Sequence, residues 1–571
     1  MSELVRFLRE KVWAFGDARW YARVDSVRGE LVEVERLGYA QLDARARAIG
    51  AWLVAETLPG AHVMLMYPAG LEFLAAFLGC LYSGRVAVPV PLPNTDRRAS
   101  TRAEGVVHDA DIHLILTDAG HQPDSWSAER DLPLRCVASD QITSSVTWSP
   151  LALEPSAVAY VQYTSGSTSE PRGVVVTHGN LLHNLLSIRE VTTTEDIREE
   201  ARSTTWSPPL AGWLPHYHDM GLVGMLLGPM ASYSNLVFSS PVSFVAHPRL
   251  WLQMISHYRA SHTIAPDFGY DWLLRSLKDD DLTGLDLSSL RFALSGGEPV
   301  RAGLLDAVAR RLAPIGFRRD AWAPSYGLAE STLMVTGTPC GSGATVRTFD
   351  REELETGRTV PAPTGLDLVA CGSPVDTDLR IIDPHTRDEL KEGDIGEIWV
   401  RGGSVATGYL GNAEATAEHF AATTSDGDGP FLRTGDLGFL FDDELYVTGR
   451  AKDLIISNGR NIHPQDIERI GESADPAAGR GAAFTLPDSD AIVLVQEVQP
   501  LHLTGRPPAV LADLVRRRVA EELRLAVQVV IVAPMSVPRT TSGKVQRART
   551  RDALRAGRLT TLHSDRTSPI T

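Results

Sequence analysis

A run of glycine and hydroxyl-bearing residues follows an apolar stretch near residue 160. It reads Thr164-Ser-Gly-Ser-Thr-Ser169, and Arg172 and Gly173 come shortly after it. Glycine lets a backbone approach an anion closely, and successive N–H groups and hydroxyls then offer several hydrogen bonds to phosphate oxygens. The spacing differs from the GxxxxGK[ST] loop of P-loop nucleotidases, and no lysine ends the run. The run therefore predicts either a phosphate-binding loop of another type or a Ser- and Thr-rich turn.

A second polar segment reads His216-Tyr-His-Asp219. Two histidines two positions apart could bind a metal ion, but the sequence offers no clear third or fourth ligand. A histidine that lines a binding pocket and a histidine that is buried for structural reasons are the alternatives.

Lys544 ends the segment Pro538-Arg-Thr-Thr-Ser-Gly-Lys544, between a strand-like run and a basic helical segment. Its ammonium is a point charge on a long flexible stem, which suits it to enter a site from a neighbouring element. The alternative is an ordinary solvated loop lysine.

The elements that must position these residues alternate from the N-terminus to about residue 340. Strand-like runs at 63–67 and 157–163 precede helical patterns at 73–82 and after Thr177, which is a suitable helix cap. Such alternation predicts an α/β fold in layers, with two parallel-sheet subdomains. From about residue 369 to 449, short alternating strands between Gly- and Asp-rich turns predict a small β-rich subdomain.

The length of 571 residues predicts more than one domain, because single hydrophobic cores stop growing near about 250–300 residues. We place the boundary after Gly449. Residues 1–449 then form a large N-terminal α/β domain, and residues 450–571 form a smaller, mobile α+β domain. The elements expected in the smaller domain include a loop at 475–481, a strand at 528–532 and a helix at 545–556 that ends at Gly557.

Composition excludes several classes of protein. A net charge of −16 argues against a protein whose whole surface binds nucleic acid, because phosphate contact needs a basic face. The four cysteines lie far apart without a CxxC pair, which argues against a disulfide framework and fits the reducing cytoplasm. Charged residues interrupt both the N-terminal segment and the apolar stretch at 71–90, so we expect neither a signal peptide nor a membrane span.

Taken in order, the segments resemble the signature motifs of the adenylate-forming superfamily, which includes acyl-CoA synthetases, peptide-synthetase adenylation domains and luciferases. The resemblance spans nearly the whole chain, and so many motifs in the family's order make it specific. Besides the run from Thr164, the matching segments are Tyr82-Ser-Gly-Arg-Val-Ala-Val-Pro89, Gly212-Trp-Leu-Pro-His-Tyr-His-Asp-Met-Gly221, Ser295-Gly-Gly-Glu-Pro-Val300, Ser325-Tyr-Gly-Leu-Ala-Glu-Ser331, Thr434-Gly-Asp-Leu-Gly438, Gly449-Arg-Ala-Lys-Asp453 and Thr541-Ser-Gly-Lys-Val545.

Within the superfamily, the chain is most similar to the fatty acyl-AMP ligases. That match rests on the segment from Trp213, on Gly459-Arg-Asn-Ile-His-Pro-Gln-Asp-Ile-Glu468, and on extra sequence between Ser331 and Cys371. We place the family-type insertion at residues 345–370. In that family the insertion hinders the productive pose of coenzyme A, and the acyl group goes to a carrier protein instead.

Three positions depart from the family pattern. Arg172 stands where lysine is usual, and Ser169 stands where glycine is common. Arginine keeps the positive charge and adds a planar fork of donors. Pro324 occupies a position where many relatives have a polar contact to adenine, which puts that contact in doubt but not the pocket.

The resemblance implies a reaction that uses ATP and Mg²⁺. A fatty-acid carboxylate attacks the α-phosphorus of ATP, acyl-AMP forms and pyrophosphate leaves. Because two anions must meet, positive charge and oriented donors are the central requirement. The resemblance assigns catalysis to Lys544, His218 and Glu330; the phosphates to Thr164, Ser165, Gly166, Ser167 and Thr168; adenine, ribose and their surroundings to Gly296, Gly297, Glu298, Ser325, Tyr326, Gly327, Asp436 and Arg450; Mg²⁺ to Glu330 and Thr168; and the acyl pocket to Trp213, His218, Asp219, Met220 and Met225.

For these residues the resemblance implies specific roles. Tyr326 would stack on adenine, and the two oxygens of Asp436 would accept hydrogen bonds from the ribose hydroxyls. Asp219 would belong to the hydrogen-bond network of His218. Lys544 would offset charge as the new bond forms, and Lys452 would be the hinge about which the C-terminal domain rotates for the second step.

The implied acceptor is the phosphopantetheine thiol of a separate holo acyl carrier protein. Five arginines between Arg547 and Arg558 form a basic segment that could steer an acidic carrier, or could be a solvated helix. The runner-up function is a fatty acyl-CoA synthetase that uses coenzyme A. Two further alternatives are a P-loop nucleotidase and an inactive adenylate-binding module; the phosphate loop and the presence of Glu330, Asp436 and Lys544 argue against them.

Overall fold

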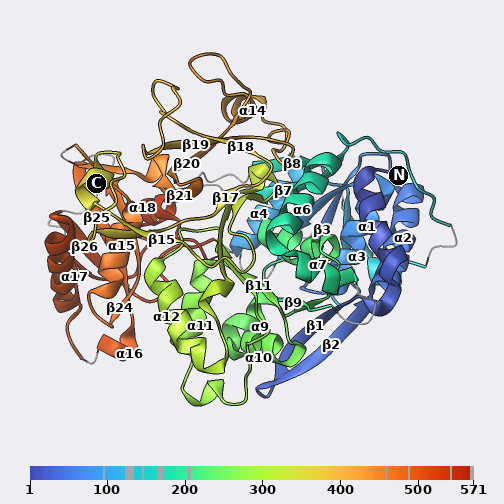
Figure 1. Cartoon of the computed structure of the whole chain (residues 1–571), viewed down its shortest axis with the longest axis horizontal. Helices are drawn as coiled ribbons and strands as arrows, with labels where there is room; N and C mark the ends of the chain where they lie inside the picture. Colours follow the sequence, from blue (N-terminus) through green and yellow to red (C-terminus); the bar gives the residue numbers. More distant parts are fainter. Residues whose placement is uncertain are drawn as a thin grey trace.

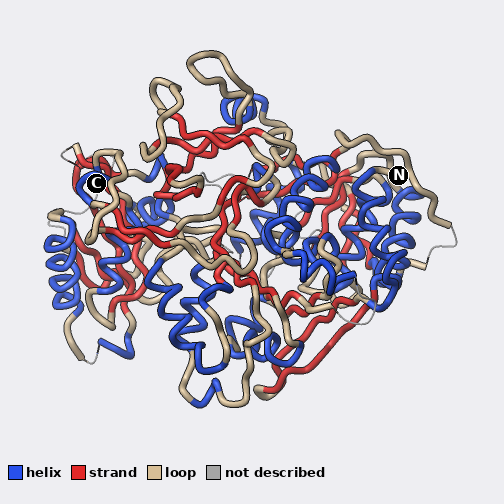
Figure 2. Tube along the Cα trace, in the orientation of Figure 1, coloured by secondary structure: helices blue, strands red, loops and turns tan. Residues whose placement is uncertain are grey.

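The computed structural model describes ten stretches of the chain, and its larger sheets lie side by side with the C-terminal residues packed at one end (Figures 1 and 2). Among the helices in these stretches, none is long and apolar enough to cross a membrane. The described residues are 1–93, 97–121, 134–143, 147–164, 172–202, 207–457, 459–486, 489–503, 505–540 and 543–565.

One sheet has six strands in the order β6-β5-β3-β4-β7-β8, and all pairs except β7–β8 are parallel. Every residue of β4 is buried, as expected for a parallel strand with both faces covered. The strands are β3 (His62–Met66), β4 (Val86–Val90), β5 (Leu114–Thr117), β6 (Arg135–Ala138), β7 (Val158–Thr164) and β8 (Arg172–Thr177).

A second sheet has nine strands in the order β17-β14-β13-β12-β11-β9-β10-β1-β2. Its central pairs are parallel, and antiparallel strands close both edges. The prediction of an α/β fold with largely parallel sheets is therefore confirmed. The strands are β1 (Trp20–Val27), β2 (Glu30–Gly38), β9 (Leu210–Gly212), β10 (Leu236–Phe238), β11 (His262–Ala265), β12 (Phe292–Gly296), β13 (Trp322–Gly327), β14 (Met334–Gly337) and β17 (Ser373–Pro374).

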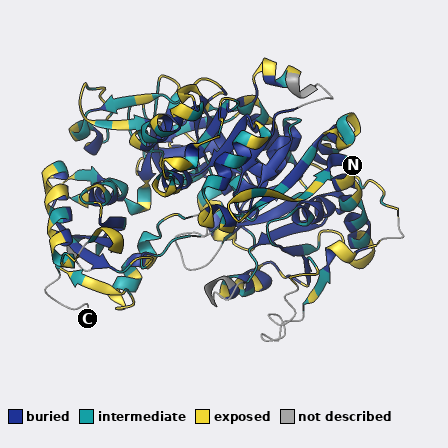
Figure 3. Ribbon diagram, turned by 90° about the horizontal axis from the view of Figure 1, so that it is seen from below, coloured by how far each residue is buried: buried dark blue, intermediate teal, exposed yellow. Residues whose placement is uncertain are grey.

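Two helices contact both sheets. Helix α3 is buried at nearly every position and contacts β1, β2, β3 and β4, whereas α6 is buried along one face and contacts β7, β8 and β14. Buried residues fill the interior of the molecule (Figure 3). Thr177 caps α6 as predicted, because its hydroxyl accepts a hydrogen bond from the N–H of Asn180 at 3.1 Å. The helices of this part are α1 (Glu3–Phe15), α2 (Tyr39–Glu56), α3 (Leu71–Ser83), α4 (Arg97–Asp109), α6 (His178–Thr192), α7 (Glu195–Arg202), the π-helix η3 (Met220–Leu227), α8 (Gly228–Ala231), α9 (Pro241–Ala246), α10 (Arg249–Tyr258), α11 (Asp267–Ser276) and α12 (Ala302–Leu312).

A four-stranded antiparallel sheet follows, which agrees with the β-rich segment expected between 369 and 449. Residues 345–370, where we placed the insertion, form a separate β-hairpin with a short helix. The elements are β15 (Val346–Phe349), α13 (Arg351–Glu355), β16 (Leu366–Val369), β18 (Asp378–Ile382), β19 (Gly396–Arg401), α14 (Ala413–Phe420), β20 (Leu432–Phe441) and β21 (Glu444–Arg450).

The C-terminal residues build an apolar core of their own, from Ile455 to Ile531. This core supports a domain boundary near Gly449, which remains our proposal. The prediction of a loop at 475–481 is partly wrong, because β24 already begins at Ala478. The elements are β22 (Ile455–Ser457), β23 (Arg460–Ile462), α15 (Pro464–Ser473), β24 (Ala478–Leu486), β25 (Ser489–Val498), α16 (Pro500–Leu503), α17 (Pro508–Leu523), β26 (Val527–Val532), α18 (Arg547–Arg555) and β27 (Thr561–Ser564).

Candidate active site

A cavity of about 1490 Å³ lies where the strand ends, the antiparallel sheet and the C-terminal residues meet. Thr164 ends β7, Gly296 ends β12 and Gly327 ends β13, and all three line the cavity. Ligands of α/β proteins bind at the carboxyl ends of parallel strands, so this position is the one the topology favours. The predicted phosphate-loop residues Ser165, Gly166, Ser167 and Thr168 lie outside the described residues.

Asp436 lines this cavity, and each oxygen of its carboxylate contacts another side chain. The hydroxyl of Tyr326 donates to its Oδ2 at 2.9 Å, and the guanidinium of Arg450 lies 3.0 Å from its Oδ1. Burial raises the pKa of Tyr326, and the charge of Asp436 raises it further, so the phenol remains a donor. The carboxylate keeps lone pairs for further donors such as hydroxyl groups, because each of its oxygens accepts more than one hydrogen bond.

The Gly-Gly segment after β12 brings backbone close to other elements. A Cβ at Gly296 would lie 2.6 Å from the carbonyl oxygen of Ser325, and a Cβ at Gly297 would lie 2.9 Å from the sulfur of Met220. Ser325 and Met220 line the same cavity. Side chains at these two glycines would therefore disturb its wall.

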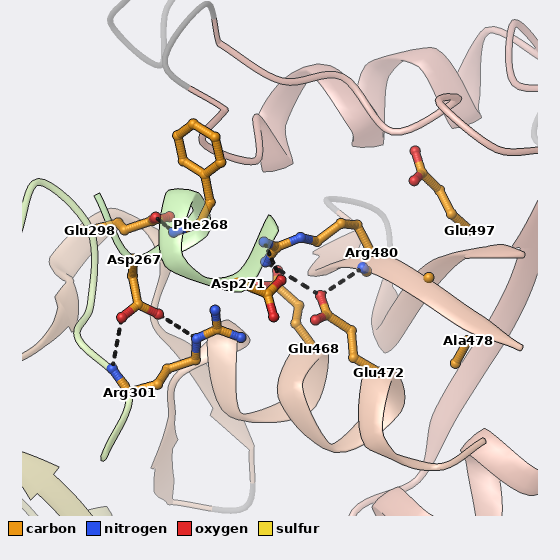
Figure 4. A network of polar contacts seen from close by, with 12 residues as sticks. Asp267, Phe268, Asp271, Glu298, Arg301, Glu468, Glu472, Ala478, Arg480 and Glu497 are labelled. Atoms are coloured by element: carbon orange, nitrogen blue, oxygen red, sulfur yellow. Dashed lines mark hydrogen bonds and ion pairs between the residues drawn. The ribbon is translucent and has the colours of Figure 1, made fainter. Parts of the chain in front are cut away.

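Glu298 lines the cavity, and its side chain makes a contact that we did not expect. Its carboxylate accepts a hydrogen bond from the N–H of Phe268 at 2.5 Å, near the start of α11, and Asp267 beside it pairs with Arg301 (Figure 4). Burial raises the pKa of Glu298, and nearby Asp267 raises it further. The residue thus fixes the N-terminus of α11 beside the cavity.

Glu330 lines the cavity on the short helix η7 (Ala329–Ser331). Its Oε1 accepts a hydrogen bond from the hydroxyl of Tyr409 at 3.0 Å. Among the residues that the structure describes, its other oxygen accepts no hydrogen bond. Sequence reasoning missed Tyr409, which is 79 positions away in the chain.

The residues present fit a magnesium ion that is bound mainly through phosphates. Mg²⁺ is commonly bound by one or two carboxylates together with substrate phosphates and water. Glu330 offers one such carboxylate on the cavity that Thr164, the last residue of β7, also lines. In the described part of the chain, no group of three or more His, Cys, Asp and Glu residues could hold a metal by itself, which also leaves the His216–Asp219 segment without support as a metal centre.

His218 is neutral on the cavity wall. Burial lowers its pKa to about 3, and the charges of Arg102 and Lys544 act in the same direction. The side-chain amide of Gln162 donates to the carbonyl of Tyr217 at 2.8 Å and so fixes the neighbouring backbone. The carboxylate of Asp219 accepts a hydrogen bond from the N–H of Met220 at 2.7 Å. Asp219 therefore caps the π-helix η3.

The apolar arm of the cavity follows η3 and only partly matches the predicted acyl pocket. Met220 lines it, but Trp213 and Met225 lie behind the wall: Trp213 stacks on Phe244, with ring centroids 3.7 Å apart, and Met225 packs against Gly212. The wall residues that we missed share small or aliphatic side chains. They are Leu214, Gly221, Gly224, Gly228, Ile264, Leu294 and Leu333.

Lys544 reaches the cavity from the C-terminal part. Its loop is closed by hydrogen bonds between Lys544 and Thr540. Gly543 has φ +83°, and a Cβ there would lie 3.0 Å from the ring of Phe268. Only glycine allows this approach, and it brings Lys544 near His218 and Asp219. Burial raises the pKa of Asp219, and the charge of Lys544 opposes this rise.

Ion pairs across α11 and the C-terminal residues hold this arrangement. Asp271 and Arg275 on α11 face Arg480 and Glu472, and we call these four residues the ion-pair cluster (Figure 4). Arg480 lies 3.2 Å from Asp271, and Arg275 lies 3.9 Å from Glu472.

Arg547, the first arginine of the basic segment on α18, is bound within the chain. Arg547 makes two hydrogen bonds to Glu468, at 2.7 and 2.8 Å, and one to Asp453 at 2.9 Å. A docking role for Arg547 is therefore not supported, because its guanidinium is already bound within the chain. Lys452 lies on η8 (Ala451–Asp453) at the cavity edge, where burial lowers its pKa and the charge of Arg450 lowers it further.

A family model described as AMP-binding enzyme matches residues 16–410. The chain belongs to this family. The AMP-binding enzyme is 38% identical over 538 residues to the medium-chain-fatty-acid–[acyl-carrier-protein] ligase JamA of Moorena producens, covering 90% of this chain and 89% of that one. It is 33% identical over 571 residues to the putative fatty-acid–CoA ligase FadD21 of Mycobacterium tuberculosis, covering 96% and 97%.

Among solved structures, the enzyme is similar to a fatty acyl-adenylate ligase from Legionella pneumophila in complex with acyl adenylate and pyrophosphate. The identity is 34%, the TM-score is 0.74, and the match covers 98% of this chain and 97% of that one. The resemblance to fatty acyl-AMP ligases is thereby confirmed. The protein is an adenylate-forming enzyme that uses ATP.

Proposed function

We propose that this AMP-binding enzyme activates a fatty acid as acyl-AMP and then passes the acyl group to the phosphopantetheine thiol of a separate acyl carrier protein. The observation that carries the proposal is the meeting of Glu330, Asp436 and Lys544 on one cavity, although they come from three distant parts of the chain. A carboxylate, a sugar-binding aspartate and a mobile cation are what this reaction requires.

In the first step, the fatty-acid carboxylate lies beside His218, with its chain along η3. Because His218 is neutral, it offers a hydrogen bond without forming a competing ion pair with the substrate. Lys544 places its ammonium between the carboxylate and the α-phosphate and offsets the charge that develops there. Asp436, held by Tyr326 and Arg450, binds the ribose.

Magnesium would be held by Glu330, and Thr168 is a second candidate. When bound, it neutralises charge on the phosphates. The protein's own contribution is to hold the Glu330 carboxylate through the hydrogen bond that Tyr409 donates to it.

For the second step, we propose that the C-terminal residues rotate about Lys452. Lys452 lies on η8, which directly follows β21, and Lys544 lies on a loop whose close contact to the larger part involves Phe268. A few residues that absorb a change in φ and ψ suffice for a hinge. The rotation would withdraw Lys544 and open the cavity to the thiol.

Two acceptors have support. The relative JamA is named as an acyl-carrier-protein ligase, whereas the relative FadD21 is named as a putative fatty-acid–CoA ligase. The hairpin at residues 345–370 favours the carrier, because its Glu355 pairs with Arg460 of the C-terminal part at 2.6 Å and so occupies that boundary.

The test is mass spectrometry of acyl transfer from a panel of fatty acids with ATP, comparing coenzyme A with a holo carrier protein. We expect acyl-AMP with the parent enzyme and acyl carrier protein as the main product. Lys544→Ala should lower the rate of acyl-AMP formation about 100-fold, as loss of a charge-stabilising group does. Preferential formation of acyl-CoA would refute the proposed acceptor, and no acyl-AMP from any fatty acid would refute the activity.

A further inference from the structure

Tyr409 is fixed against the strand that leaves the phosphate loop. Its segment adds to β8 as a short antiparallel strand: the N–H of Leu410 donates to the carbonyl of Gly173 at 2.7 Å, and the N–H of Val175 donates to the carbonyl of Gly408 at 2.9 Å. Tyr409 and Val174 form the β-bridge between them. The backbone of Tyr409 therefore keeps one position relative to the end of the phosphate loop.

The side chain of Tyr409 contacts two charged residues at once. Its hydroxyl donates to Oε1 of Glu330 at 3.0 Å, and the guanidinium carbon of Arg172 lies 5.2 Å from the centre of its ring. Tyr409 is 8% exposed, and its ring also packs against His419 and Phe420. The phenol can hardly rotate, so both partners are held in a defined place.

We propose that Tyr409 is a positioning residue that orients Glu330 toward the metal and Arg172 toward the phosphates. This inference rests on the proposed function. A carboxylate with one oxygen anchored presents the other in a fixed direction, and Mg²⁺ demands nearly ideal octahedral geometry. Partners that orient a metal ligand commonly contribute 10- to 100-fold to metal affinity or activity.

The same contact explains why arginine occupies position 172. A planar guanidinium stacks on an aromatic face and keeps its donors free at the edge, whereas an ammonium does not offer this geometry. Arg172 begins β8, directly after the phosphate loop.

Two substitutions separate the two contacts. Tyr409→Phe removes the hydroxyl and keeps the ring, so we expect the Mg²⁺ concentration for half-maximal adenylation to rise about 10-fold. Arg172→Lys keeps the charge and loses the stacking, so it should raise the KM for ATP without changing the Mg²⁺ requirement. Because Arg172 also acts on the hydroxyl that donates to Glu330, the effects of the two changes should couple rather than simply add.

The decisive readout is direct metal binding rather than turnover. Electron paramagnetic resonance measures the affinity for Mn²⁺ in the presence of an unreactive ATP analogue, for the parent, Tyr409→Phe and Tyr39→Phe. Tyr39 is the matched control, because its buried hydroxyl donates to the carbonyl of Ser234 at 2.6 Å. We expect weaker Mn²⁺ binding in Tyr409→Phe only.

The outcomes distinguish the inference from the proposed function. Unchanged Mn²⁺ affinity and Mg²⁺ requirement in Tyr409→Phe would overturn the positioning role, provided that the parent forms acyl-AMP. An equal loss in Tyr39→Phe would also overturn it, because the effect would then be a general one of a buried phenol. A parent enzyme that forms no acyl-AMP would refute the proposed function instead.

Discussion

The protonation state of His218 is set by its surroundings. Its pKa of about 3 lies below the ordinary value of about 6.5, first because of burial and then because of Arg102 and Lys544. In the folded enzyme the imidazole is therefore neutral at every pH above about 4, and only the unfolded chain would protonate it near pH 6.5. A neutral imidazole can donate to or accept from the substrate carboxylate without retaining it as an ion pair.

We therefore predict that His218→Asn lowers the rate of adenylation by a similar factor, on the order of 10-fold, at every pH between 5.5 and 8.5, as loss of a hydrogen bond to a charged group does. The rate of carboxylate-dependent pyrophosphate exchange, measured across this range, tests the prediction. The two pH profiles should run parallel. An inflection near pH 6.5 that is present in the parent and lost in the variant would show that His218 titrates, contrary to its burial.

At the same scale, the sequence predicted residues with local motifs but not their partners. Lys544, Glu330 and Asp436 stand in recognisable segments, and the structure places all three on one cavity. Tyr409 and Phe268 have no such motif, because their contacts depend on how distant segments pack. No local pattern reveals that a glycine at 543 must pass a ring at 268.

At the scale of elements, η3 sets the width of the apolar arm of the cavity, because a glycine of this helix leaves space where a side chain would lie. A Cβ at Gly224 would lie 3.2 Å from Ile264 and 3.3 Å from Leu333. The sequence pattern predicted that residues of the η3 segment are buried, but not which of them face the cavity. In a π-helix the hydrogen bonds run to i+5, so the residues that share a face differ from those of an α-helix. Met225 was misplaced on the pocket wall partly for this reason.

Gly224→Leu should therefore close the arm partway along. We predict that the variant loses activity with long fatty acids by at least about 10-fold relative to short ones, because an excluded methylene is worth that much in a tight pocket. The measurement is kcat/KM for acyl-AMP formation over a chain-length series. Gly105→Leu on α4 is the control, because a Cβ there meets nothing within 4 Å. A uniform loss at all chain lengths would contradict the prediction.

At the scale of the whole molecule, the ion-pair cluster holds the arrangement in which Lys544 reaches the cavity. Asp271 is largely buried and Arg480 is one-quarter exposed, so their attraction is only partly screened by water. If the C-terminal residues rotate between the two steps, these pairs must break. The cluster should then favour adenylation at the expense of acyl transfer.

Arg480→Ala should therefore slow adenylation several-fold and leave transfer from preformed acyl-AMP unchanged or faster, since screened pairs of this kind are worth about 1 kcal/mol. Pyrophosphate exchange and single-turnover transfer to the acceptor measure the two steps separately. Rising salt should reduce the difference between parent and variant in the first step, because it weakens the pairs in the parent. Arg506→Ala is the matched control, since Arg506 makes a 2.8 Å pair with Asp475 inside the C-terminal part. If Arg480→Ala and Arg506→Ala alter both steps equally, the cluster only stabilises the fold and does not select a domain arrangement.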